Sequence, residues 1–401
     1  MKNKKYFERN IKLNYIIGSL MWGRFFIPVL ALFYIASQVT LEQFTIIMGV
    51  FALSTLIFEI PTGVIADLLG KKKTLLISRT MYVIEIILIA FFDGFWVFLV
   101  AKIISGIGVS FSSGTNQALL YDSLKRLKKE KEYKKISGLS NAISKISMAF
   151  VFIIGAYLFT LNHKLPAILS LPLITLGFIL TFFIKEPYIA KKKVNLQNSL
   201  IHLKEGLKYF KKNYYLKYLA FFTFLIGSTI SMMLSLSSKY FELILIPITF
   251  IGIISFILNL ASAYSARKAH FLEEKFGEKN SIFLTIILTF FSVFLMSFLI
   301  PYIGVFFFLI LVFVQGFYEV IIGDYVNRHI ETSHRATMLS INNMFDNIGI
   351  FILFPIIGYI NKIYSWKLSI LSFSIFILIC CFFLIIYYKN SSKIKNTETD
   401  T

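Results

Sequence analysis

The sequence predicts an all-helical integral membrane protein, with twelve transmembrane helices in two pseudo-symmetric six-helix bundles. Three observations lead to this fold class: the composition, the lengths of the apolar runs and an internal repeat. Hydrophobic residues make up 57% of the 401 residues and charged residues only 15%, with a mean hydropathy of +0.74. Soluble domains are about 45–50% apolar and about 25% charged. A soluble globule of this composition would expose contiguous apolar surface, so a soluble enzyme, a disordered chain and a disulfide-stapled secreted domain are excluded.

The apolar runs have the length of membrane spans. A bilayer core about 30 Å thick needs a helix of about 20 mostly apolar residues. The predicted spans are 13–37, 44–66, 74–93, 95–121, 138–160, 165–185, 215–237, 246–268, 281–300, 303–326, 338–360 and 366–388. The polar stretch between the sixth and seventh spans divides them evenly. We therefore expect an N-terminal bundle at 1–185, a cytoplasmic linker with a short amphipathic helix at 186–214, a C-terminal bundle at 215–388 and a cytoplasmic tail at 389–401.

Basic residues follow the alternation of the predicted loops. The stretches on one side contain 33 of the 41 lysines and arginines, and those on the other side contain four. The positive-inside rule therefore places both termini in the cytoplasm. It also explains the net charge of +20 without a nucleic-acid partner. The abundance of lysine, isoleucine and phenylalanine is typical of a low-GC bacterium, so we expect a bacterial cytoplasmic membrane, with membrane lipids as partners.

An internal repeat supports two related halves. At an offset of 202 residues, the fourth span of each half ends in the same pattern, Gly114, Asp122 and Arg126 matching Gly316, Asp324 and Arg328. At an offset of 207, Asp67-x-x-Gly70-x-Lys72 matches Glu274-x-x-Gly277-x-Lys279, after the second span of each half. Because both matches fall at equivalent places, a duplicated six-helix unit is predicted.

The most specific motif lies at the predicted inner end of the second span, Gly63-x-x-x-Asp67-x-x-Gly70-Lys71-Lys72-Lys73. We expect Gly63 to permit close helix approach and Asp67 to meet a helix N-terminus or a cation. Gly70 suits a tight turn, and the lysines hold the loop at the cytoplasmic surface.

This segment resembles the signature loop between spans two and three of the major facilitator superfamily, although Leu68 stands where the family often has Arg or Lys. With the spans and the repeat, the resemblance covers nearly the whole chain, and it implies a transporter that works by alternating access. In that family the loop belongs to the gate between the bundles. The gate candidates are Gly63, Asp67, Gly70, Lys71 and Lys72, with the span ends Asp122 and Asp324.

A second resemblance lies in span four, where Lys102-x-x-x-Gly106-x-Gly108 looks like a family motif of many proton-coupled members. Lys102 stands where that motif normally has arginine. The glycines give a thin helix face for tight packing. A hairpin turning near Asp93-Gly94 places Glu85 and Lys102 at similar depth, so a structural ion pair between them is expected.

Charges inside spans are costly in lipid and are candidates for function. The candidates for substrate binding or proton coupling are Arg24, Glu59, Lys102, Lys145, Glu319 and Asp346. Structural roles remain open for each of them. Arg24 could pair with an acid on a neighbouring helix, and Glu59 could pair with Lys145.

The chain shows no metal-ligand pair of histidines and no phosphate-binding G-x-x-x-x-G-K-[ST] loop, so we expect no metal, no cofactor and no enzymatic activity. The segments at 59–63 (EIPTG) and 118–124 (ALLYDSL) look like those of bacterial multidrug exporters of the superfamily. This resemblance implies proton-coupled efflux of amphipathic drugs or antibiotics. We expect a monomer, because monomeric function needs nothing further from the sequence. The alternatives are uptake or exchange of a small nutrient or metabolite by the same fold, and a non-transporting membrane sensor.

Overall fold

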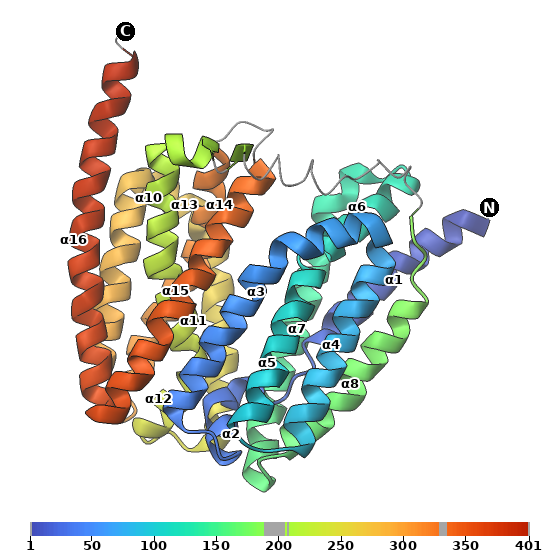
Figure 1. The fold of residues 1–401 in the computed structure, drawn as a ribbon, viewed down its shortest axis with the longest axis horizontal. Coiled ribbons are helices and arrows are strands. Elements are labelled where there is room, and N and C mark those ends of the chain that lie inside the picture. The colour runs from blue at the N-terminus through green and yellow to red at the C-terminus, as the bar shows by residue number, and fades with distance from the viewer. Residues whose placement is uncertain (1, 188–204, 207, 329–334, 400–401) are drawn as a thin grey trace. The chain divides into compact units, whose positions relative to one another are not determined.

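The computed structural model describes residues 2–187, 205–206, 208–328 and 335–399, and this part of the chain consists of helices joined by short connections, without a strand (Figure 1). Ten of its helices are long and apolar enough to cross a membrane. The all-helical membrane fold class is therefore confirmed. Residues 188–204 and 207 lie outside the described residues, so the amphipathic helix expected in the linker stays a prediction.

The described chain forms two compact units. Unit 1 comprises residues 1–40, 50–199 and 248–256, and unit 2 comprises 41–49, 200–247 and 257–401. The helices of the first half are α1 (Lys2–Met21), α2 (Leu30–Ala36), α3 (Leu41–Leu69), α4 (Lys71–Phe91), α5 (Phe95–Ser112), α6 (Thr115–Arg126), α7 (Tyr133–Leu161) and α8 (Leu165–Phe182). Those of the second half are α10 (Tyr214–Phe222), the π-helix η3 (Thr223–Gly227), α11 (Ser228–Ser235), α12 (Ser237–Leu243), α13 (Ile248–Met296), α14 (Gly304–Arg328), α15 (Arg335–Ile363) and α16 (Trp366–Thr399).

The ten long helices account for the twelve expected spans once two irregularities are considered. The predicted first span is broken, since α1 ends at Met21 and α2 begins only at Leu30. The predicted eighth and ninth spans are joined in α13, whose 49 residues would measure about 73 Å at 1.5 Å per residue, too long for one crossing. Gly277 interrupts this helix with φ 73° and ψ 164°, and thereby separates two segments of span length.

Glycines in α5 allow the close packing that the span-four motif predicts. A Cβ atom on Gly106 would lie 2.9 Å from the backbone oxygen of Phe51 on α3. A Cβ atom on Gly108 would lie 3.1 Å from the Cβ of Met81 on α4. Contacts this short leave no room for a side chain, so α5 packs tightly against both neighbouring helices of unit 1.

Candidate functional site

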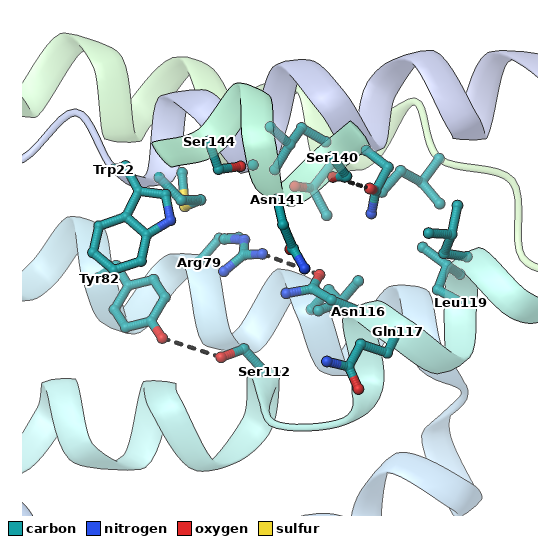
Figure 2. Close-up of a pocket in the computed structure, with 18 of the residues that line it drawn as sticks. Trp22, Arg79, Tyr82, Ser112, Asn116, Gln117, Leu119, Ser140, Asn141 and Ser144 are labelled. Atoms are coloured by element: carbon teal, nitrogen blue, oxygen red, sulfur yellow. Dashed lines mark hydrogen bonds between the residues drawn. The ribbon is translucent and has the colours of Figure 1, made fainter. Parts of the chain in front are cut away.

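Unit 1 contains a partly open cavity of about 420 Å³ between α1, α4, α5, α6, α7 and α8. Its wall contains both polar and apolar side chains, and Figure 2 shows the labelled polar ones around the same space. The polar and aromatic lining residues are Asn10, Asn14, Trp22, Arg24, Arg79, Tyr82, Ser112, Asn116, Gln117, Ser137, Ser140, Asn141, Ser144 and Thr181. Polar groups inside a membrane protein face the bundle interior or a water-filled cavity, where they mark solute pathways.

Helical periodicity explains why one face of α7 lines the cavity. Ser137, Ser140, Asn141 and Ser144 follow each other at i, i+3, i+4 and i+7 on α7, which puts them on one helix face. Sequence reasoning missed this stripe, although its spacing in a predicted span was a usable signal. The break after α1 brings Trp22 and Arg24 to the cavity from a segment without regular helix.

Hydrogen bonds fix several of the lining side chains (Figure 2). Ser140 Oγ donates to Asn14 Oδ1 at 2.8 Å, and the Tyr82 and Ser112 hydroxyl oxygens lie 3.2 Å apart. Arg79 Nη2 donates to Asn116 Oδ1 at 3.2 Å. The wall is therefore organised before any solute enters, which reduces the ordering cost of binding.

A buried charge cluster stands beside the cavity. The Glu85 side chain is fully buried, with Lys102 Nζ at 2.8 Å from Oε1 and Arg24 Nη1 at 3.4 Å from Oε2. The expected Glu85–Lys102 ion pair is confirmed, and the acid that could partner Arg24 is Glu85. Lys102 does not line the cavity, whereas Arg24 does, with its guanidinium carbon 4.5 Å from the centre of the Tyr82 ring.

Arg79 is the functional candidate that sequence reasoning did not select. The residue is only 4% exposed, and it lines the cavity from α4. Among the described side chains no carboxylate lies within ion-pair distance of its guanidinium, and its Nε has no hydrogen-bond partner there. A buried arginine without an acid is unusual, because buried charges are normally paired. Its position in a predicted span was the available signal.

The other charges predicted for the first half lie elsewhere. Lys145 on α7 is exposed and forms no ion pair with the side chains that the structure describes, so the expected Glu59–Lys145 pair is not present. Glu59 on α3 is partly buried. Neither residue lines the cavity.

The predicted gate residues of unit 1 form a charged turn. Gly70 has φ 88°, and Lys71 Nζ contacts the carboxylate of Asp122. Glu186, which sequence reasoning missed, accepts hydrogen bonds from the backbone nitrogens of Lys71 at 2.9 Å and Lys72 at 2.6 Å. It thereby satisfies the N-terminus of α4.

The expected close approach of a helix to Gly63 is not seen among the described residues, since a Cβ atom there would meet nothing within 4 Å. Asp67 lies in α3, and its side chain is not among those described.

The corresponding region of unit 2 has a different ion pair. Arg328 Nη1 and Nη2 lie 3.0 and 3.1 Å from the two carboxylate oxygens of Glu273, and Nη2 lies 2.5 Å from Asp324. The hydrogen bonds from Arg328 to Glu273 raise the pKa of the guanidinium above its usual value. The predicted gate residue Asp324 thus shares Arg328 with an acid from α13.

Among the predicted acids of the second half, Asp346 has the most unusual surroundings. Its Oδ1 is buried and has no hydrogen-bond partner in the described part of unit 2. The same oxygen would lie 2.9 Å, and the Tyr318 hydroxyl 2.6 Å, from a Cβ atom on Gly227. Gly227 ends the π-helix η3, a form of backbone that is frequent at functional sites. Glu319, in contrast, is exposed and accepts a hydrogen bond from Gln315 at 2.8 Å.

A family model agrees with this fold and cavity. The model of the Major Facilitator Superfamily matches residues 14–317 and 246–400. The chain therefore belongs to this superfamily, whose members are membrane carriers and not enzymes.

Individual relatives support the same assignment. The chain is 26% identical over 387 residues to YxaM of Bacillus subtilis (strain 168), named an uncharacterized MFS-type transporter, and covers 93% of each chain. It is 26% identical over 326 residues to the uncharacterized transporter BU466 of Buchnera aphidicola subsp. Acyrthosiphon pisum (strain APS), covering 76% of this chain and 77% of the relative.

Solved structures show the same fold. The nucleoside transporter NupG is similar with a TM-score of 0.80 and 14% identity, covering 97% of this chain and all of NupG (100%). The D-xylose-proton symporter has a TM-score of 0.74 and 13% identity, covering 96% of this chain and 98% of the symporter. At these identities the likeness concerns the fold and leaves the solute open.

Proposed function

We propose that this chain is a proton-coupled secondary transporter of a bacterial cytoplasmic membrane that binds a small polar solute in the cavity of unit 1. The observation that supports this proposal best is the cavity of about 420 Å³ within a bundle of membrane-spanning helices, lined by amide, hydroxyl and guanidinium groups. Sites for small molecules have volumes of about 300–1,000 Å³ and a few placed polar groups. The two bundles at 1–185 and 215–388, with both termini in the cytoplasm, would provide the alternating access.

The chemistry of the wall favours a nutrient or metabolite over an amphipathic drug. Asn116 and Asn141 offer hydrogen bonds that a polar solute uses and that an apolar one would leave unsatisfied. The Tyr82 ring is already occupied by the Arg24 guanidinium at 4.5 Å. A cationic drug would compete with that guanidinium for the ring.

Efflux of amphipathic compounds is the second candidate function. Trp22, which is 44% exposed, and the apolar residues Ile17, Met21 and Ile27 also belong to the cavity wall. An aromatic and aliphatic strip of this kind could hold the apolar part of a drug. The resemblance of the segments 59–63 and 118–124 to multidrug exporters points in the same direction.

Proton coupling is proposed on the basis of Asp346. An unpartnered buried carboxyl oxygen makes the charged form costly, so the group is suited to bind and release a proton as its surroundings change. Exposed Glu319 and partly buried Glu59 are weaker candidates for the same role.

The test uses the full chain reconstituted in proteoliposomes that contain a pH-sensitive dye. Polar metabolites and amphipathic drugs are added in turn under an imposed proton gradient, and solute-dependent proton flux is recorded. Asn141→Trp is designed to fill the cavity. The control, Leu139→Trp, changes a 50% exposed residue two positions away on α7 that does not line the cavity.

We expect flux with a polar solute, its loss in Asn141→Trp and its retention in Leu139→Trp. Drug-dependent flux that Asn141→Trp leaves intact would overturn the proposed site. Absence of flux with every solute would favour the non-transporting sensor.

A further inference from the structure

We propose that the cavity of unit 1 is an anion site, and that the transported solute is a small hydrophilic molecule with a carboxylate or phosphate group held by Arg79 and Arg24. This inference names the substrate class of the site proposed above and rests on that proposal. Its basis is a positive charge at the cavity wall that the described protein does not neutralise.

The charge balance around the cavity is uneven. The charge cluster of Arg24, Lys102 and Glu85, taken together with Arg79 on the cavity wall, contains three cations and a single carboxylate. Both carboxylate oxygens of Glu85 are already engaged, one by Lys102 at 2.8 Å and the other by Arg24 at 3.4 Å. If each of these groups carries its formal charge, their net charge is therefore two positive charges. Charges in a membrane interior are costly unless paired, so a bound anion would be stabilised by this excess.

Arg79 has unused hydrogen-bonding capacity that faces the cavity. An arginine has five N–H donors in a planar fork. The described structure gives Arg79 one side-chain acceptor, Asn116 Oδ1 at 3.2 Å, and leaves its Nε without a partner. Figure 2 shows the guanidinium pointing toward Asn116 and Asn141 across the cavity. A fork of this kind binds carboxylate and phosphate oxygens with two parallel hydrogen bonds.

The neighbouring groups complement an anion and disfavour a cation. Asn116 and Asn141 can each donate a hydrogen bond from the side-chain NH₂ group to an anionic oxygen or to a hydroxyl on the body of the solute. The described lining contains no aspartate or glutamate. A cationic solute would therefore face two guanidinium groups, one of which, that of Arg79, has no countercharge among the described residues. The site is then selective by repulsion as well as by attraction.

Binding is tested on the purified full chain in nanodiscs of zwitterionic lipid, by thermal unfolding and calorimetry. The probes are succinate and acetate for carboxylates, glycerol 3-phosphate and inorganic phosphate for phosphates, uncharged glycerol, and the tetraphenylphosphonium cation. We expect at least one anion to raise the unfolding temperature in a saturable way, and glycerol and the cation to leave it unchanged. Comparison of the carboxylate probes with the phosphate probes shows which of the two anionic groups the site binds. Stabilisation by the cation or by glycerol alone, or by none of the probes, would overturn the proposal.

Variants of Arg79 identify the site. Arg79→Gln is expected to weaken anion binding about tenfold to a hundredfold, because it removes charge-assisted hydrogen bonds. Arg79→Lys keeps the charge without the fork and should fall between Arg79→Gln and the original chain. The matched control is Lys125→Gln, which removes one positive charge from an exposed position on α6 outside the cavity wall. Equal affinities in Arg79→Gln and Lys125→Gln would contradict the proposal.

Asn116→Asp serves as a second test if Arg79→Gln does not fold. It places a carboxylate at the position that already accepts a hydrogen bond from Arg79 at 3.2 Å. The excess charge is then neutralised within the protein, so we expect a higher unfolding temperature for the empty protein together with loss of anion binding. A lower unfolding temperature with unchanged anion binding would show that Arg79 is not free to bind an anion.

Failure of this inference differs from failure of the proposed function. Transport of an uncharged polar solute without anion binding would refute the anion site and leave the transporter proposal intact. Saturable anion binding that depends on Arg79, without transport of any solute, would support the anion site and refute the proposed transport function.

Discussion

Lys102 Nζ lies 2.8 Å from Glu85 Oε1 across the hairpin of α4 and α5, and Glu85 is fully buried. Arg24 reaches the other oxygen of the same carboxylate at 3.4 Å. Glu85 therefore links the broken first span to the hairpin. Lys102, in the position where the resembling family motif has arginine, orders the interior of unit 1 and does not touch the cavity.

Replacing Glu85 should be strongly destabilising. Glu85→Gln leaves Arg24 and Lys102 as buried cations without a countercharge, and breaking a buried pair costs about 3–5 kcal/mol. The expected result is a large fall in the thermal unfolding temperature of the purified protein. The double variant Glu85→Gln with Lys102→Met removes one orphaned charge as well. It should recover part of the loss, and a double variant less stable than the single one would contradict this account.

Two equivalent glycines should tolerate alanine poorly. Gly70 has φ 88° with ψ 157°, and Gly277 has φ 73° with ψ 164°, a region that residues with a Cβ atom almost never occupy, at a cost of about 1–3 kcal/mol. We expect Gly70→Ala and Gly277→Ala each to lower the free energy of unfolding by this amount in a denaturant titration.

Gly63→Ala is the matched control for those two substitutions. Gly63 lies within α3, and an added Cβ atom would meet nothing within 4 Å. Alanine should therefore be neutral or stabilise the helix by up to about 1 kcal/mol. A cost similar to that of Gly70→Ala would mean that Gly63 contacts a partner absent from the described contacts.

Gly70 and Gly277 have the same backbone conformation, and this shows how far the sequence could predict the fold. Equivalent positions in the 207-residue repeat have the same unusual backbone, because a tight turn between adjacent helices requires it in each half. The same reasoning could not find the break at Trp22, since hydropathy measures the length of an apolar run and not its local dihedral angles. The break depends on tertiary packing, where the backbone of Phe25 approaches Gly155 of α7.

The candidate site was harder to predict than the fold. Spacing placed Glu85 and Lys102 at similar depth, but it could not show that Arg24 shares the same carboxylate. Nor could it show that Arg79 receives no acid among the described residues. Which of several intramembrane charges remains unneutralised depends on helix rotation and on three-dimensional distances, and the sequence alone does not contain these.

The ion pair of Arg328 with Glu273 provides a prediction about pH. The pKa of Arg328 is raised, so its contribution to stability is complete below the ordinary pKa of an arginine in the unfolded chain. It is lost only as the pH rises through the still higher folded-state value. The contribution of the guanidinium should therefore be constant up to about pH 10. The Arg328 side chain is 43% exposed, which limits its value to about 1 kcal/mol.

Arg328→Lys tests the geometry of this pair, because lysine retains the charge but not the two parallel hydrogen bonds at 3.0 and 3.1 Å. We expect a loss of about 1 kcal/mol in unfolding experiments, the same at about pH 7 and pH 9, because lysine is still charged at both. A lysine variant as stable as the original chain would mean that charge alone accounts for the contact.

Asp346→Asn should uncouple solute movement from the proton gradient. The buried Oδ1 of Asp346 has no partner among the described residues, and it lies close to Gly227 at the end of the π-helix. Protonation would remove the costly charge there, and asparagine mimics that neutral state permanently. In proteoliposomes we expect solute exchange without a gradient to continue, while accumulation driven by the proton gradient is lost. The control Glu132→Gln neutralises an acid whose side chain is 47% exposed and should retain accumulation. If Asp346→Asn still accumulates solute against a gradient, another acid takes up the proton, and Glu59 and Glu319 would be substituted next.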